Sequence, residues 1–212
     1  MGIRTIVVVG LAAWAGWLLV RGILNRRVPW IGLALIAVPL LLLGWSERQW
    51  ISAEHTYSAI ARALAPGTEG VHCQRLGETF TYAGAELGHV DWDEDGRPLG
   101  AALISYETCG RLAAYADGDK DTPPLEQVIA VHVLTHESMH LAGRLVESDA
   151  DCAAMQRDAW TAQQLGATAA QGQRLAQTYW REVYPRMPDA YTDRACAAGE
   201  ALDESPGDGV WP

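Results

Sequence analysis

Two apolar stretches open the chain, and each is long enough to be a membrane helix. The first runs from Thr5 to Leu24, and the second runs from Val28 to Trp45 without a charged residue. A helix needs about 20 residues, and at least roughly 17, to cross the hydrocarbon core of a bilayer. The pattern therefore predicts a two-helix transmembrane hairpin over residues 1–45, which would bring the protein into contact with membrane lipid.

After this hairpin the chain shows helical and then strand-like periodicity. Residues 46–65 predict a helix that ends at Pro66-Gly67, inside a linker segment that spans residues 46–70. An Asp95-Gly96 pair further on predicts a hairpin turn between two strands. The stretches with strand character are Val71–Leu76, Thr79–Ala83, Gly88–Trp92 and Leu99–Tyr106.

A helix with clear boundary signals follows over residues 123–142. Thr122 is its predicted N-cap and Pro123 its first residue, where a missing N–H group has no cost. Gly143 is the predicted terminator, because glycine readily adopts the left-handed conformation. Apolar residues recur along this segment at helical spacing, at Val128, Val131, Leu134 and Leu141.

Two more helices are predicted, over residues 147–165 and 169–184. Gly166 separates them, and Thr168 with Gln171 forms a capping-box signature at the start of the second. Together these elements predict an α+β domain over residues 71–212, in which a small antiparallel sheet packs on the helix at 123–142.

The distribution of charge bears on partners and on orientation. Residues 1–45 carry four of the 16 Lys and Arg residues and no acid, so 12 remain against all 26 Asp and Glu. A domain this acidic repels the phosphate backbone, which argues against nucleic acid as a partner. The short basic link Asn25-Arg26-Arg27 favours a cytoplasmic loop, with the C-terminal domain outside the cytoplasm. A cleaved signal peptide over the first stretch and the reverse orientation are the alternatives.

The cysteines agree with an extracytoplasmic domain. All four lie after the hairpin, and none forms a C-x-x-C pair, a pattern that fits two disulfides in an oxidising compartment. Four cysteines allow three connectivities, and the spacing favours Cys73 with Cys109 and Cys152 with Cys196. Buried free thiols in a cytosolic domain are the competing interpretation.

The predicted helix at 123–142 carries a possible metal site, His136-Glu137-Ser138-Met139-His140. Residues four apart lie one turn apart on the same helix face, so both imidazoles can reach one ion. The glutamate beside the first histidine can take a proton from the attacking water, which is why H-E-x-x-H is typical of zinc metallopeptidases. A hydrolytic zinc site needs three protein ligands, and Glu147 is the best third one because the turn after Gly143 can direct the next helix back across the metal.

Several other residues could support this site. Asp151 lies one turn after Glu147 and could accept the second N–H of a ligand histidine, while His132 lies one turn before His136 and is either an outer-shell or a packing residue. Tyr184 and Tyr191 are candidate donors to the oxyanion of a tetrahedral intermediate, with packing against Trp180 as the alternative for Tyr184.

The combination of H-E-x-x-H with Glu147-Ser148-Asp149-Ala150-Asp151 resembles the gluzincin metallopeptidases, and its E-x-x-A-D form resembles membrane peptidases of the CAAX-processing type. Only six residues separate His140 from Glu147, a shorter spacer than in those families. Gly143 matches the opening of the metzincin motif, whose third ligand would fall on Val146. The segment from Ala130 onward also resembles a family of uncharacterised actinobacterial H-E-x-x-H proteins.

These resemblances imply a zincin-like fold in which an edge strand above the motif helix pairs with an extended substrate, and chain order makes Leu99–Tyr106 that strand. The function expected from the sequence is a membrane-anchored zinc metallopeptidase that acts on a peptide or protein. Imidazole and carboxylate ligands favour zinc among the common ions. A non-catalytic zinc-stabilised membrane protein and a zinc hydrolase acting on a non-peptide bond of the cell envelope are the alternatives.

Overall fold

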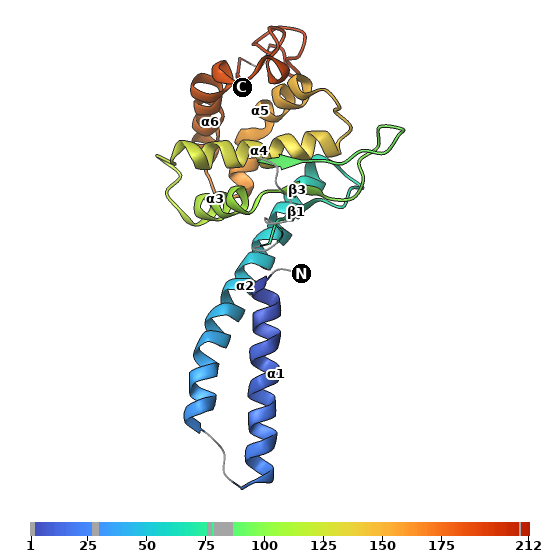
Figure 1. Ribbon diagram of the computed structural model, residues 1–212. Coiled ribbons are helices and arrows are strands. Elements are labelled where there is room, and N and C mark those ends of the chain that lie inside the picture. Colours follow the sequence, from blue (N-terminus) through green and yellow to red (C-terminus); the bar gives the residue numbers. More distant parts are fainter. Residues whose placement is uncertain (1–2, 27–29, 76–77, 79–86, 208) are drawn as a thin grey trace. The chain divides into compact units, whose positions relative to one another are not determined.

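The computed structural model describes residues 3–26, 30–75, 78, 87–207 and 209–212. It is a helix-rich α+β structure with one three-stranded sheet in this described part, as the order of elements predicts at the level of fold class (Figure 1). Backbone contacts divide the chain into two compact units, which are residues 1–53 with 75–84 and residues 54–74 with 85–212. The predicted strand Thr79–Ala83 lies outside the described residues.

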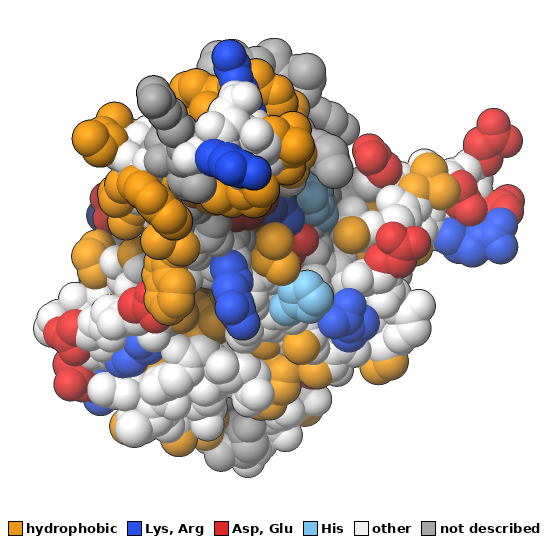
Figure 2. All heavy atoms as spheres, turned by 90° about the horizontal axis from the view of Figure 1, so that it is seen from below, with side chains coloured by type: hydrophobic (Ala, Val, Ile, Leu, Met, Phe, Trp, Pro, Cys, Tyr) orange, Lys and Arg blue, Asp and Glu red, His pale blue; other side chains and the backbone are white. Residues whose placement is uncertain are grey.

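Two N-terminal helices are long and apolar enough to cross a membrane, by length and composition. Helix α1 spans Ile3–Leu24, and α2 spans Trp30–Leu64 as one continuous helix of 35 residues. The helix predicted for residues 46–65 is thus present and ends before Pro66-Gly67, and it continues the second apolar stretch without a break. Large apolar side chains of both helices stay exposed, as Figure 2 shows in part in orange.

The sheet contains three short strands in the order β1-β3-β2. Strand β1 (Val71–Cys73) runs parallel to β3 (Ala102–Ile104), and β2 (Gly88–His89) runs antiparallel to it. The predicted purely antiparallel sheet is thus wrong. The predicted edge strand is also wrong, since β3 lies in the middle of the sheet and β2 is at the edge.

The hairpin turn at Asp95-Gly96 is confirmed. Trp92 and Pro98 form an antiparallel bridge on either side of it, and Gly96 has a φ of +72°. The hairpin extends away from the helices of its unit, and acidic side chains gather at its tip beside a basic one (Figures 1 and 2).

Both cysteine pairs lie at disulfide-bonding distance in the arrangement that the spacing favours. Cys73 of β1 pairs with Cys109 of α3 (Tyr106–Asp117), with their Cα atoms 6.0 Å apart. Cys152 pairs with Cys196 across a Cα distance of 5.6 Å. The second pair attaches the C-terminal segment to the helix that carries Glu147 and Asp151.

The helix of the H-E-x-x-H motif, α4, spans Leu125–Leu141. It begins later than predicted, and Pro124 rather than Thr122 occupies the N-cap position. Pro124 disfavours the helical conformation at Pro123, so the helix starts only after the proline pair, and the hydroxyl of Thr122 donates to Asp119 at 2.9 Å. Gly143 adopts the expected left-handed conformation with a φ of +94°.

Two helices follow close to their predicted positions. Helix α5 spans Glu147–Gln164, and α6 spans Ala169–Thr178 with the predicted capping box of Thr168 and Gln171. The predicted helix at 169–184 does not stay α-helical, because residues 179–183 form a π-helix and residues 184–186 form a 3-10 helix.

Helix α4 occupies the centre of its unit. It contacts strands β2 and β3, the helices α3, α5 and α6, and the π-helical segment. All residues from Ala130 to Leu141 are buried, whether polar or apolar. The motif residues are therefore placed where groups from several elements can reach them.

Candidate metal centre

Helix α4 brings the two histidines of the motif together. His136 and His140 are buried, with exposed fractions of 7% and 5%, and their rings meet edge to face with centroids 4.6 Å apart. This is the geometry that the four-residue spacing predicts, because residues i and i+4 lie on one face of a helix.

The turn between α4 and α5 adds Glu147 to this pair. Left-handed Gly143 reverses the chain, and backbone hydrogen bonds from Gly143 to His140 and from Arg144 to Met139 close the helix end. Glu147 is then the first residue of α5, and its Oε2 lies 3.1 Å from Nε2 of His136 and 3.2 Å from Nε2 of His140. The three predicted ligands thus converge on one point.

The contacts of His140 favour a cation at this point. Its Nδ1 donates a hydrogen bond to the carbonyl of Arg144 at 2.6 Å, so in the neutral ring Nε2 carries a lone pair. That lone pair faces a carboxylate oxygen 3.2 Å away. Two acceptors at this distance repel each other unless a proton or a metal ion lies between them.

The spacing of the ligand atoms also suits a metal ion. Zinc bonds of about 2.0–2.1 Å in a tetrahedron place neighbouring ligand atoms about 3.3 Å apart, close to the two distances from Glu147. Burial lowers the pKa of His136, which favours the neutral imidazole that metal binding requires. The hydrogen bond with His136 lowers the pKa of Glu147 and keeps it ionised. His136, His140 and Glu147 therefore fit a divalent ion by chemistry and by distance.

The site opens into a cavity of about 530 Å³. Glu137, which is 4% exposed, lines this cavity together with both histidines and Glu147. Tyr191 lines it as well, with its ring centroid 5.9 Å from that of His136. Much of the remaining wall is apolar, and it includes Leu87, Val90, Trp92, Ile129, Val133, Val183, Met187 and Pro188.

Strand β2 approaches Glu137 so closely that only glycine fits. A Cβ atom on Gly88 would lie 2.7 Å from Oε1 and 2.8 Å from Cγ of Glu137. Real Cβ atoms essentially never make contacts this short. The Glu137 carboxylate can therefore occupy its position only because residue 88 has no side chain. The edge strand of the sheet therefore packs directly against the second residue of the motif.

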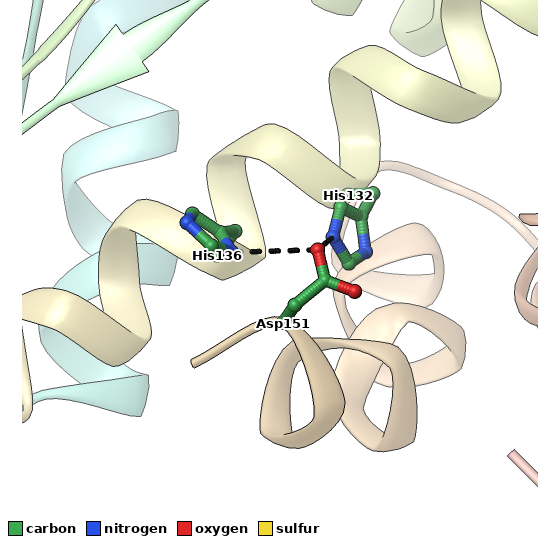
Figure 3. A group of neighbouring side chains, drawn as sticks. All are labelled: His132, His136 and Asp151. Atoms are coloured by element: carbon green, nitrogen blue, oxygen red, sulfur yellow. Dashed lines mark hydrogen bonds and ion pairs between the residues drawn. The ribbon is translucent and has the colours of Figure 1, made fainter. Parts of the chain in front are cut away.

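A second polar group lies beside His136 (Figure 3). Oδ1 of Asp151 is 3.7 Å from Nδ1 of His136 and 3.0 Å from Nε2 of His132. The structure thus places both predicted supporting residues next to the candidate metal centre, with Asp151 between the two histidines.

The two candidate oxyanion donors differ in their surroundings. Tyr191 lines the cavity, whereas Tyr184 is not among its lining residues. The hydroxyl of Tyr184 accepts a hydrogen bond from the backbone N–H of Asp193 at 2.9 Å, and its ring stacks on Trp180. These contacts agree with the alternative interpretation of Tyr184, in which it packs against Trp180.

Sequence reasoning did not select three residues that support the site, Gly88, Arg144 and Asp158. The sequence pattern around Gly88 is that of an ordinary strand, and the pattern around Arg144 is that of a loop. The carbonyl of Arg144 nevertheless orients His140, and its guanidinium pairs with Asp149 and Glu204. Asp158 lies seven residues after Asp151 on α5, and this helical spacing is the one hint that both could face the same partner.

Comparison with protein-family models, with curated proteins and with solved structures finds no match to this chain. The function is therefore argued from the geometry of the site alone.

Proposed function

We propose that this protein is a membrane-anchored, zinc-dependent metallopeptidase whose metal ligands are His136, His140 and Glu147. The observation that supports this most is the convergence of both histidine Nε2 atoms on one oxygen of Glu147, within a cavity that Glu137 also lines. Imidazole and carboxylate ligands suit zinc among the common divalent ions.

The chain's own residues account for binding and proton transfer. A bound zinc ion would supply Lewis acidity, which polarises the scissile carbonyl and makes water a better nucleophile. Glu137 takes the proton of the attacking water and passes it to the leaving amine, as a general base and then a general acid. The Tyr191 hydroxyl is a donor on the cavity wall for the oxygen that becomes negatively charged.

The cavity wall indicates the kind of substrate side chain, and the N-terminal helices indicate the compartment in which the protein acts. The apolar wall formed by residues such as Ile129, Val133 and Met187 would accept an apolar side chain of a peptide next to the scissile bond. The paired cysteines and the basic link between α1 and α2 favour an extracytoplasmic domain anchored by two membrane helices.

The direct test uses the full-length protein purified in detergent. Bound metal is measured by mass spectrometry, and cleavage of a peptide library is followed with and without a chelator. We expect close to one zinc per chain, and cleavage that the chelator abolishes and added zinc restores. Protein that binds zinc but cleaves no peptide would contradict the peptidase activity. Protein that binds no metal in the presence of excess zinc would contradict the metal site.

The close approach of β2 gives an independent prediction. Gly88→Ala should reduce peptide cleavage by at least about tenfold, because the new Cβ must displace the Glu137 carboxylate, while zinc content stays unchanged because Glu137 is not a ligand. The same assays on Gly110→Ala provide the control, since a Cβ at Gly110 in α3 has no atom within 4 Å. Full activity of Gly88→Ala would argue against a catalytic position for Glu137.

A further inference from the structure

A buried chain of charged groups extends from the metal centre into the contact between α4 and α5. His132 lies between two carboxylates, with Nδ1 at 2.8 Å from Asp158 and Nε2 at 3.0 Å from Asp151. All three residues are almost fully buried, with exposed fractions of 3%, 0% and 1%. Asp151 in turn faces Nδ1 of His136, as Figure 3 shows.

The hydrogen bonds define the state of His132. Each carboxyl group can accept a hydrogen bond from one ring nitrogen of His132, and a ring that donates from both nitrogens is an imidazolium. Burial lowers the pKa of His132, but Asp158 and Asp151 outweigh this effect and raise it to about 10. His132 is thus an imidazolium at neutral pH, held between two carboxyl groups.

Tyr179 completes the surroundings of this cation. Its ring stacks on His132 with centroids 3.6 Å apart, and its hydroxyl donates to Oδ1 of Asp151 at 3.3 Å. Tyr179 is the first residue of the π-helical segment, and such segments occur frequently at functional sites. Asp151 therefore receives hydrogen bonds from two sides, and the same oxygen atom is the one that faces His136.

We propose that His132, held by Asp158, is a positioning residue for the metal centre, because its Nε2 holds Oδ1 of Asp151 in place facing Nδ1 of His136. This inference rests on the proposed metal site but not on the peptidase activity. A carboxylate behind a ligand histidine fixes the tautomer and orientation of the ring, and loss of such a partner weakens metal binding. Without His132, Oδ1 of Asp151 would lose one of its two hydrogen-bond partners, and the carboxylate would no longer be held facing His136.

The burial of three ionisable side chains is difficult to explain by packing alone. Apolar residues of similar volume usually fill such a position at no loss of stability. The contact between Thr135 and Thr161 shows that the same two helices also pack through a neutral polar pair, with their hydroxyls 3.0 Å apart. This threonine pair is the matched control, since both residues are buried on α4 and α5 and neither lines the cavity.

The test compares His132→Gln and Asp158→Asn with the double variant Thr135→Val/Thr161→Val, all in the full-length protein. The readouts are the zinc dissociation constant from competition with a chelator and the visible absorption spectrum of the cobalt-substituted protein. Asp158→Asn keeps the shape of the side chain, so it remains informative if His132→Gln fails to fold.

We expect zinc affinity to fall by about 10–100-fold in both network variants, with a changed cobalt spectrum. The threonine variant should bind zinc and cobalt as the wild type does, even if it is less stable. Wild-type affinity and spectrum in Asp158→Asn would overturn the proposal, as would a second equivalent of zinc that depends on His132. Wild-type protein that binds no zinc would remove the metal site and this role together, whereas zinc without cleavage would contradict only the peptidase.

Discussion

Glu137→Gln is expected to bind zinc as well as the wild type does and to cleave peptides about 10²–10⁴ times more slowly. The amide has nearly the same shape as the carboxylate but cannot take a proton from water, and the loss of one general base typically reduces a rate by this factor. Metal content should not change, because the proposed ligand atoms belong to His136, His140 and Glu147.

The measurement is the initial rate of cleavage of one fluorogenic peptide selected from the library, alongside zinc content from the same preparation. Glu126→Gln is the matched control, since Glu126 is exposed in the first turn of the same helix and does not line the cavity. A Glu137→Gln variant that cleaves at the wild-type rate would exclude this residue as the base. A variant that loses its zinc would assign Glu137 to the ligands instead.

His140→Ala and Glu147→Ala are each expected to lose zinc and the stability that zinc provides. A ligand that binds only the folded state adds about 2.7 kcal/mol to the free energy of unfolding at a concentration 100 times its dissociation constant. The wild type should therefore show a higher melting temperature with zinc than with a chelator. Both variants should melt at the same temperature in the two conditions.

This comparison uses the full-length protein in detergent, and a His55→Ala variant serves as the control. His55 is exposed on α2, outside the cavity, so its replacement should leave the zinc-dependent shift intact. Retention of the shift in Glu147→Ala would show that the third ligand is another group. Its retention in His140→Ala would contradict the site as a whole.

The parts of this fold that the sequence predicts are those governed by local interactions. A capping box forms between residues three apart, and Thr168 with Gln171 does so here. The left-handed turn at Gly143 follows from the absence of a Cβ atom. The pairing of His136 with His140 follows in the same way from the pitch of an α-helix.

Other features depend on how distant segments pack, and local patterns carry little information about them. Strand character at residues 99–106 does not indicate which neighbours the strand has. Strand β3 is central because it pairs with β1 on one side and with β2 on the other. The start of α4 also moved, since Pro124 disfavours the helical conformation at Pro123 before it.

The same distinction applies to the site. The motif and its spacing are enough to select His136, Glu137 and His140 as a group, because one helix holds them. The position of Glu147 against both rings and of His132 between Asp151 and Asp158 depends on the packing of α4 on α5. The space for Glu137 depends on Gly88, about 50 residues away in sequence. These contacts are tertiary because each joins groups on different elements, so their distances depend on helix and strand packing that no local pattern encodes.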